Sequence, residues 1–462
     1  MTTYTTCRPH VHPEAPNLYG ASVSGSTVGL SVVADGPGVY RPRHPERTSF
    51  YQILDDHFES YVRVHEERFE PRSGPLRPVV RETVEAFLNC AQLKNGFARL
   101  RCEAFGGEHL LAFSCQRRGI CSSCVAKRSA LFAEKLTEEI LAPVPHHHVV
   151  FTIPKALRGL FERERSLLGR LAGWAYEAVK TCFQEVLAHH DAVPGFVASI
   201  QTFGAYGCNF HPHLHALVTA GLLATGGEFI PLPSVDTSVP TFAFRKLVLD
   251  GLHKAERLSD RFRESLLSWT HSGFSIWLGP AIPADDGDQL ERMARYLTRP
   301  PIAMGSVMLT PEGQVLISTP PDTRTGESIK ILDPLEWIQA ITSQIPDPRQ
   351  HVALYYGAYA NRARAKYRQS KDETPTAPLP IDHPDDAETA FAKSRRKSWA
   401  RLLRKIFEVD PMICARCGVE MKVISVVTSP KTIDKILAHV KSGKGHDPFE
   451  ARAPPSSLGQ TG

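Results

Sequence analysis

Long hydrophobic runs are missing from this chain of 462 residues. No window approaches the roughly eighteen uncharged apolar residues of a membrane-spanning helix, so we expect no membrane association. Residues 1–40 also lack a basic segment followed by an apolar core, and nothing marks the chain for secretion. A Gly-x-x-x-x-Gly-Lys-Ser/Thr phosphate loop is absent too, which argues against a nucleoside triphosphate as energy source. Together these absences predict a cytoplasmic protein.

The composition is that of a folded soluble protein, with 42% hydrophobic and 22% charged residues. The length exceeds what one ordinary hydrophobic core accommodates and predicts two or three domains. A net charge of +5 is too small to indicate a nucleic-acid partner by itself. The basic residues are nevertheless grouped, at Arg292, Arg295 and Arg299, at 362–368 and in the run 393–405. Each group taken singly is equally consistent with a solvated helix face.

The ten cysteines include two Cys-x-x-Cys pairs, Cys121 with Cys124 and Cys414 with Cys417. In a reducing compartment such pairs indicate a metal site more than a disulfide. Each pair supplies half of a tetrahedral zinc site and needs two further ligands.

Apolar periodicity divides the middle of the chain into strands and helices. We expect strands at 148–153, 196–203, 214–223 and 274–278, and helices at 155–190, 243–269 and 288–298. The order strand, helix, strand, strand, helix, strand is that of the ferredoxin-like split unit. The sequence therefore predicts an α+β fold with a central ferredoxin-like antiparallel sheet and helices packed on it.

Alternating histidines stand at the start of one expected strand, in the sequence His211-Pro212-His213-Leu214-His215. Because side chains two apart on a strand share a face, His213 and His215 are placed to bind one cation. Metallo-β-lactamase-like hydrolases also use His-x-His but continue with Asp-His, whereas Ala216-Leu217-Val218 follows here. For a third ligand we expect Gln201, opposite the pair in a hairpin, with His211 as the competitor.

Tyr296 lies near the end of an expected helix, with Arg292 four residues before it and Arg299 three after. On a helix both arginines would flank the phenol on one face, and a guanidinium matches the oxygens of a phosphate. Pro300 disfavours helical conformation at Arg299, which puts the tyrosine in a final turn. A core tyrosine beside solvated arginines is the alternative.

These residues together resemble the HUH transposases of the insertion-sequence ninety-one class and their common-region relatives, over residues 87–440. The resemblance implies a DNA transposase that nicks and joins single-stranded DNA. In it, His213 and His215 hold a divalent ion, Mg²⁺ or Mn²⁺, and Tyr296 forms a covalent 5′-phosphotyrosine. The main branch has Tyr-x-x-x-Tyr, but Pro300 occupies the second position here, so the chain resembles the single-tyrosine branch.

The resemblance also implies an N-terminal zinc-binding domain, which we expect to be zinc-ribbon-like. Its first Cys-x-x-Cys pair corresponds to Cys102-Glu-Ala-Phe105, where Phe105 has replaced a cysteine. Cys115 or Cys90 could substitute, and loss of the site is the alternative. The expected zinc ligands are Cys102, Cys115, Cys121 and Cys124.

The second Cys-x-x-Cys pair resembles a C-terminal motif of the same family. His439 or His446 could complete a metal site with Cys414 and Cys417. A pair without metal is the equal alternative.

Four segments follow from these patterns. Residues 1–48 are expected to form a flexible arm and residues 49–142 a helical, zinc-binding, DNA-binding domain. Residues 143–345 form the catalytic domain, and residues 346–462 form a basic C-terminal region with the second cysteine pair.

The expected partner is DNA, as a single strand or hairpin at an element end, in the bacterial cytoplasm and associated with the nucleoid. A homo-oligomer is compatible with this role. The residues expected to contact DNA are Arg295, Arg117, Arg118, Lys127 and Arg128. Two other functions stay open: an inert zinc-containing DNA-binding protein, and a metal-dependent hydrolase that uses the histidines without the tyrosine.

Overall fold

A five-stranded antiparallel sheet, in the order β12-β4-β5-β3-β8, is the largest sheet of the protein. Its strands are β3 (His146–Thr152), β4 (Gly195–Phe203), β5 (Phe210–Thr219), β8 (Ser275–Ile282) and β12 (Ala353–Gly357). The computed structural model describes residues 44–104, 106–204, 209–233, 236–319, 321, 326–367, 412–414 and 417–441. The expected α+β fold with an antiparallel sheet is confirmed at this level, and β12 is a fifth strand that periodicity did not predict.

Strand β5 has two different faces. Leu214, Ala216 and Val218 belong to the main hydrophobic core, whereas Leu217 belongs to a separate cluster on the opposite face. Because side chains alternate along a strand, His213 and His215 share the face of Leu217.

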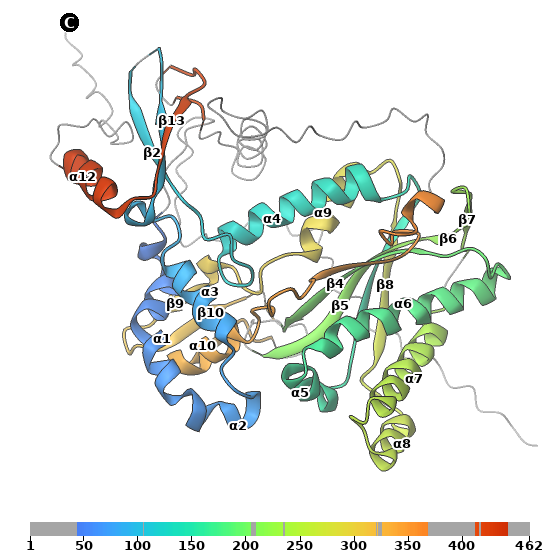
Figure 1. The fold of residues 1–462 in the computed structure, drawn as a ribbon. Helices are drawn as coiled ribbons and strands as arrows, with labels where there is room; N and C mark the ends of the chain where they lie inside the picture. The colour runs from blue at the N-terminus through green and yellow to red at the C-terminus, as the bar shows by residue number, and fades with distance from the viewer. Residues whose placement is uncertain are drawn as a thin grey trace, which may run out of the picture.

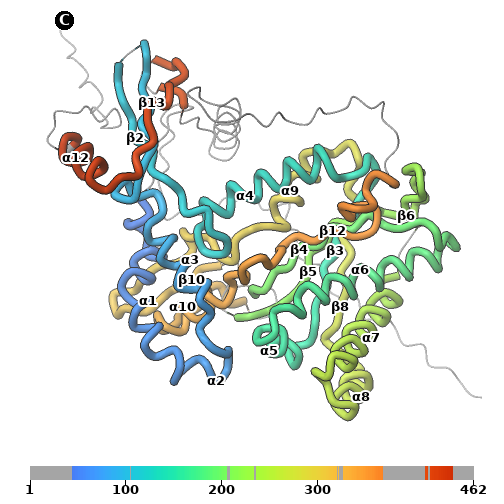
Figure 2. Tube along the Cα trace, viewed as in Figure 1, coloured from blue at the N-terminus to red at the C-terminus, as the bar shows by residue number. Residues whose placement is uncertain are grey.

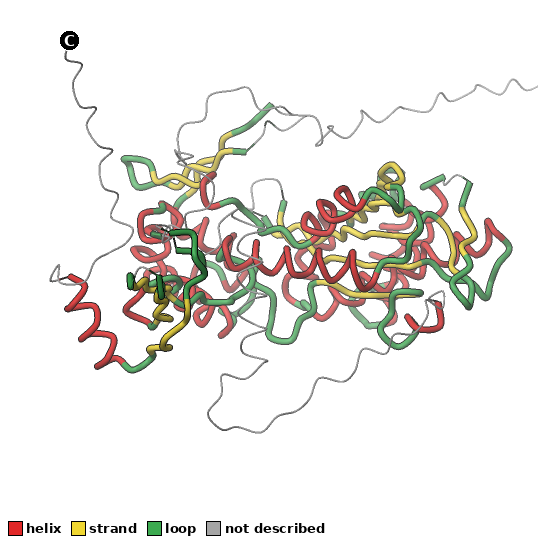
Figure 3. The backbone as a smooth tube through the Cα atoms, turned by 90° about the horizontal axis from the view of Figure 1, so that it is seen from above, coloured by secondary structure: helices red, strands yellow, loops and turns green. Residues whose placement is uncertain are grey.

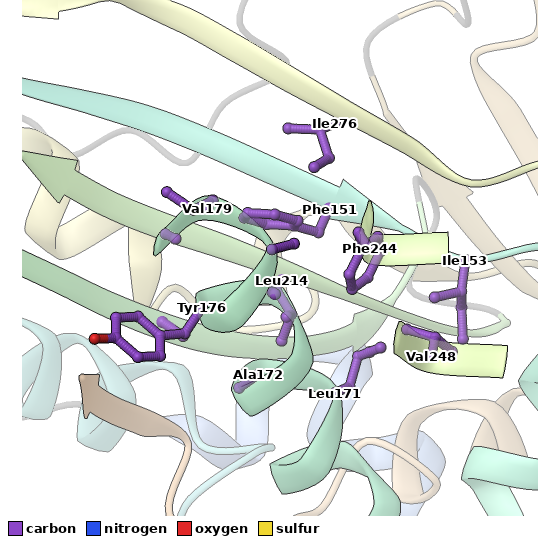
Figure 4. Close-up of a cluster of buried hydrophobic side chains, with 14 of the residues drawn as sticks. Phe151, Ile153, Leu171, Ala172, Tyr176, Val179, Leu214, Phe244, Val248 and Ile276 are labelled. Carbon is purple, nitrogen blue, oxygen red and sulfur yellow. The ribbon is translucent and has the colours of Figure 1, made fainter. Parts of the chain in front are cut away.

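Helices α5 (Lys155–Arg163), α6 (Ser166–Leu187) and α7 (Ser238–Lys254) cover the first face of the sheet (Figure 1). Helix α8 (Asp260–Ser268) packs against α7. Figure 4 shows Phe151 and Leu214 of the sheet with Leu171 of α6 and Phe244 of α7 in this buried layer.

The single helix expected at 243–269 is two helices, which corrects that prediction. The chain turns at Glu256, whose φ is 60°, and α8 starts anew with Ser259 accepting a hydrogen bond from the Phe262 N–H. A serine cap of this kind favours a fresh helix start over continuation.

The second face of the sheet is covered by α4 (Ser122–Lys135), the π-helical turn η3 (Leu136–Ile140) and α9 (Gly287–Leu297). Figure 1 shows α4 and α9 on the side of the sheet opposite α6 and α7. Ala133, Leu136, Met293 and Leu297 pack here in one buried cluster. Helix α9 is thereby fixed above the face that carries the histidines.

A second lobe lies beside the sheet (Figure 2). Its elements are α1 (Ser49–Arg68), α2 (Glu70–Ser73), α3 (Pro78–Leu88), α10 (Pro334–Thr342) and the sheet of β9 (Val307–Leu309), β10 (Val315–Ser318) and β11 (Ile329–Leu332). Trp337 of α10 is buried against Phe50 of α1, with ring centroids 4.9 Å apart. Residues 302–345, expected in the catalytic domain, thus share a core with the N-terminal helices.

Two parts of the chain that lie far apart in the sequence meet in a third sheet of order β13-β1-β2. It consists of β1 (Phe97–Arg101), β2 (Glu108–Ala112) and β13 (Lys422–Val427), and helix α12 (Pro430–Lys441) follows β13. Phe97, Val427 and Ile433 form its buried cluster. A short hairpin of β6 (Gly221–Leu223) and β7 (Phe229–Pro231) completes the strands.

Seen from above, the described part of the chain is longer than it is wide (Figure 3). Among these residues, none of the helices has the combination of length and apolar character that crossing a bilayer requires. Residues 1–43 of the expected arm, Phe105 and the basic run 393–405 lie outside the described residues.

Candidate active site and cysteine clusters

The expected histidine pair meets on β5. His213 Nε2 and His215 Nε2 lie 3.1 Å apart. His213 Nδ1 donates to the carbonyl oxygen of His211 over 2.7 Å, which leaves Nε2 as the free electron-pair donor. Both rings therefore direct Nε2 toward a shared point.

His148 of β3 is a further histidine at this site, which was not among the residues expected there. Its Nε2 lies 2.8 Å from Nδ1 of His215, and the two rings stack with centroids 5.1 Å apart. In the tautomer in which His215 Nδ1–H donates to His148, the Nε2 of His215 keeps its electron pair for a cation. The spacing His146-x-His148 was the available signal, since it repeats the alternation of the His213 pair.

Burial favours the neutral form of these three histidines. Burial lowers the pKa of His148 and of His213 to about 4 and that of His215 to about 2. Neutral imidazole is the form that binds metals.

Gln201 of β4 pairs directly with His213 across the strands, at the position expected from the hairpin. Its Nε2 donates to the carbonyl of Leu297 over 3.2 Å, and its Oε1 is buried with no hydrogen-bond partner among the described residues. A buried, unsatisfied carbonyl oxygen is costly unless a ligand occupies it. Gln201 Oε1 is thus available as a third ligand.

His211, the competing ligand, is engaged elsewhere. Its Nε2 lies 2.9 Å from a guanidinium nitrogen of Arg158 on α5, from which it accepts a hydrogen bond. Arg158 contributes to the low pKa of His213, so this arginine acts on the site electrostatically. Sequence patterns did not indicate Arg158.

Tyr296 lies over the two inner histidines. Its ring meets that of His215 edge-to-face at 5.2 Å and that of His148 at 5.8 Å between centroids. Asp286 caps the start of α9 by accepting from the Gln289 N–H over 2.9 Å. At the other end, Ser199 and Gln201 of β4 donate to the carbonyl of Leu297. The sheet thereby holds the last turn of α9, where free carbonyls need partners.

The arginines around Tyr296 differ from the expected arrangement. Helix α9 ends at Leu297, and Arg299 folds back so that its guanidinium lies 4.5 Å from the centre of the Tyr296 ring. Arg292 is exposed on α9. Arg295 forms an ion pair with Glu291 at 2.6 Å, one turn earlier on the helix.

The donor set fits a divalent ion. Two ligands in neighbouring positions of an octahedron, each about 2.1 Å from the ion, are about 3 Å apart. The 3.1 Å between the two Nε2 atoms is close to that value. Imidazole nitrogen and amide oxygen together also suit a site shared with water and phosphate oxygens.

One cysteine cluster comprises Cys90, Cys115, Cys121 and Cys124, whose sulfurs lie within 4.8 Å of one another. The Sγ–Sγ distances include 3.7 Å from Cys90 to Cys121 and 3.5 Å from Cys115 to Cys124. Sulfurs about 2.3 Å from a tetrahedral zinc ion are about 3.8 Å apart, which matches this spacing. Hydrogen bonding with Cys115 lowers the pKa of Cys90 and of Cys124 and favours their thiolates, whereas hydrogen bonding with Cys121 raises the pKa of Cys115.

This cluster corrects the expected ligand set at one position. Cys102 belongs to a second group with Cys414 and Cys417, and Cys90 takes its place beside Cys115. The reason is that Cys90 lies two residues beyond the end of α3, where the Cys115 N–H donates to its sulfur over 3.3 Å. His439 lies on α12 and is not part of the second group, and His446 lies outside the described residues.

The remaining basic residues expected at DNA lie near the start of α4. Arg118 donates to the carbonyls of Gln350 and Asp347, and Arg128 donates to the carbonyl of Gln116. Arg117 lies 3.7 Å from a carboxylate oxygen of Glu82, and Lys127 is half-buried on α4. Arg118 thus has a structural role, while Arg117 and Arg128 keep exposed side chains.

Two protein-family descriptions match the chain. Residues 195–366 match the family described as "Putative transposase", and residues 54–153 match the "Transposase zinc-binding domain". The first range contains β4, β5 and α9, and the second contains all four cysteines of the larger cluster.

Two relatives cover most of the chain. "Putative transposase y4qJ" of Sinorhizobium fredii (strain NBRC 101917 / NGR234) is 24% identical over 392 residues, 79% of this chain and 94% of that protein. "Transposase for insertion sequence element IS801" of Pseudomonas savastanoi pv. phaseolicola is 24% identical over 371 residues, 75% of this chain and 84% of that protein. No solved structure matches the chain significantly.

Proposed function

Because the chain belongs to the IS91 family of transposases with an N-terminal zinc-binding domain, we propose that it nicks and joins single-stranded DNA at element ends through a phosphotyrosine. The observation that carries this proposal is the meeting of a histidine pair on β5 with a tyrosine on α9. The Tyr296 ring lies 5.2 Å from that of His215.

The central domain is proposed to be an HUH nuclease core. Strands β3, β4, β5 and β8, with helices after β3 and after β5, follow the ferredoxin-like order strand, helix, strand, strand, helix, strand. The sheet order β4-β5-β3-β8 supports this assignment, with β12 added beside β4.

His213, His215 and Gln201 are proposed to hold Mg²⁺ or Mn²⁺. When bound, the ion supplies charge neutralisation to the scissile phosphate. His148 is a positioning residue, because it touches His215 and sets its tautomer.

Tyr296 is the proposed nucleophile. Its phenol loses a proton as the oxygen bonds to phosphorus, and the bond from phosphorus to the 3′-oxygen breaks. The departing 3′-oxygen takes up a proton, and the 5′-phosphate stays on the tyrosine. Arg299, stacked on the phenol ring at 4.5 Å, places a positive charge where the phosphate arrives. Reversal of the exchange with another 3′-hydroxyl joins strands without a nucleotide triphosphate.

The experiment uses labelled single-stranded oligonucleotides that tile both flanks of the coding sequence, incubated with the full chain and Mn²⁺. We expect a denaturation-resistant protein–DNA adduct that Tyr296→Phe abolishes. Tyr355→Phe is the matched control, because Tyr355 packs in the same cluster as Tyr296 and loses the same hydroxyl. We expect His148→Ala to raise the Mn²⁺ concentration for half-maximal adduct by about 10- to 100-fold. His147→Ala, on the other face of β3, leaves it unchanged.

The outcomes separate the competing functions. Retention of DNA binding with no adduct at any metal concentration points to an inert DNA-binding protein. Cleavage that Tyr296→Phe leaves at full rate points to a metal-dependent hydrolase, and either result contradicts the proposed tyrosine chemistry.

A further inference from the structure

Two turns far apart in the sequence share the same pattern of two backbone hydrogen bonds between described residues. In the first, the Gly106 N–H donates to the Cys102 carbonyl over 2.7 Å, and the Cys102 N–H donates to Gly107 over 2.9 Å. In the second, the Gly418 N–H donates to the Cys414 carbonyl and the Cys414 N–H donates to Val419, both over 2.9 Å. Each pattern joins a cysteine to the fourth and fifth residues after it.

A glycine with positive φ occupies the same place in both turns. Gly106 has φ 73° and Gly418 has φ 71°. This left-handed conformation is strained for other residues, so glycine serves the same purpose in each turn. Tight turns of this kind present cysteine sulfurs to zinc in knuckle motifs.

Strand pairing brings the two turns together. Strand β1 leads into the first turn, β13 follows the second, and Arg101 pairs with Lys422 between the strands. Cys102, Cys414 and Cys417 offer sulfurs within 4.8 Å of one another, and the Cys102 and Cys417 sulfurs are 3.3 Å apart. Figure 1 shows β13 beside the β1–β2 hairpin at one end of the molecule.

The environment of the three sulfurs supports a structural metal. Cys102 and Cys414 are buried with Leu100, Met412 and Met421, whereas Cys417 is exposed. Thiolates select soft or borderline ions such as Zn²⁺ over Mg²⁺. In the sequence, Phe105 stands three residues after Cys102, the place that Cys417 occupies after Cys414.

We propose that Cys102, Cys414 and Cys417 form a second zinc site, which joins two knuckles that lie far apart in the sequence into one discontinuous zinc ribbon. The protein supplies three thiolates, and the fourth position takes an exchangeable ligand such as water. The site fastens β13 and α12 to the N-terminal module across 315 residues of sequence.

The exposed third ligand and the exchangeable fourth distinguish this site from the four-cysteine cluster. Three of that cluster's cysteines are buried and the other is intermediate. The three-cysteine site should therefore release zinc first when a chelator is added. Zinc release should be biphasic.

The experiment measures zinc per chain in the full-length protein purified under reducing conditions. Cys417→Ser should lower the content by one zinc per chain, and Cys182→Ala, an isolated cysteine on α6, should not change it. Cys417 suits this test because its exposed sulfur supports no hydrophobic core. Cobalt substitution separates the cysteine sites from the histidine site, since only thiolates give intense sulfur-to-cobalt charge-transfer bands.

A gain-of-ligand variant makes the test sharper. Phe105→Cys should slow release of the labile zinc to a chromophoric chelator by at least 10-fold and strengthen the charge-transfer band. Equal zinc content in the parent and in Cys417→Ser would overturn the proposal, as would a Cys102–Cys417 disulfide found by mass spectrometry of the reduced preparation. These readouts do not involve DNA cleavage, so they are independent of the tyrosine chemistry.

Discussion

His146 is a buried histidine that makes the stability of the protein depend on pH. Its Nε2 lies 2.5 Å from the Tyr359 hydroxyl, and burial lowers its pKa to about 4. In the unfolded chain a histidine has a pKa near 6.5, so the unfolded state binds the extra proton first as the pH falls. The contribution of neutral His146 to the free energy of unfolding is therefore complete above pH 6.5 and is lost progressively as the pH falls toward 4.

We therefore expect the linkage to His146 alone to lower the free energy of unfolding by about 2 kcal/mol when the pH is lowered from 7 to 5. Urea unfolding midpoints at the two pH values measure this loss in the parent and in His146→Gln. The variant should lose less stability on acidification, because glutamine does not titrate. Since the other buried histidines are unchanged, equal losses in the two proteins would contradict the assignment to His146.

At the level of single residues, the sequence predicted which side chains meet when they lie on the same strand or on neighbouring strands of one hairpin. The alternation at His213 and His215 placed both imidazoles on one face, and Gln201 was found opposite His213. His148 and Arg158 were missed because they reach the site through strand pairing and helix packing, which no local spacing encodes. Arg299 stacks on Tyr296 only because α9 ends at Leu297 and the chain folds back.

Helix α4 connects the four-cysteine cluster to the tyrosine helix. Cys121 precedes its first residue and Cys124 lies in its first turn, and both sulfurs belong to the cluster. Farther along, the Ser129 hydroxyl donates to the carbonyl of Thr298 over 2.8 Å, two residues beyond Tyr296. A disturbance of the cluster can thus be transmitted to the end of α9.

We expect loss of this metal site to loosen α4 and α9 together. Cys115→Ser removes one ligand, and a structural zinc contributes on the order of 10 kcal/mol to folding a small module. Hydrogen exchange should then accelerate by at least 10-fold in both helices, and the adduct yield should fall although Cys115 contacts only the start of α4, through Cys124. Unchanged exchange in α9 would show that the cluster acts on the N-terminal lobe alone.

Helix α9 was predicted within one residue at each end, expected at 288–298 and found at Gly287–Leu297. The single helix expected at 155–190 is instead two helices, α5 and α6, which corrects that prediction. The break between α7 and α8 escaped prediction because apolar residues continue through it with helical spacing. Strand β12 escaped because its five residues carry no alternation; all are half-buried beside β4.

In the molecule as a whole, segments that lie far apart in the sequence share the same structural units. Described residues of 302–345 pack with the N-terminal helices, and β13 pairs with β1. This is why the ligand set could not be completed from the sequence. The partner of Cys102 lies more than 300 residues away, and spacing alone favoured the nearer Cys115.

We expect a chain that ends at Tyr367 to keep the central sheet but to destabilise β1 and β2. The truncation uncovers Phe97, which is fully buried under Val427 and Ile433. The amide hydrogen-exchange rate in β1 should rise to that of an edge strand without a neighbour, while β3, β4 and β5 stay protected from exchange. Loss of protection in the central sheet as well would mean that the two parts unfold as one unit.

The pairing of β1 with β13 also orders events during synthesis. At about 5–20 residues per second, a ribosome needs on the order of half a minute to travel from the first of these strands to the last. Until then one edge of β1 has no neighbour and its knuckle has no counterpart. A polypeptide terminated before β13 would leave the ribosome with that edge of β1 unpaired. A fully paired β1 therefore forms only in chains that have been translated as far as β13.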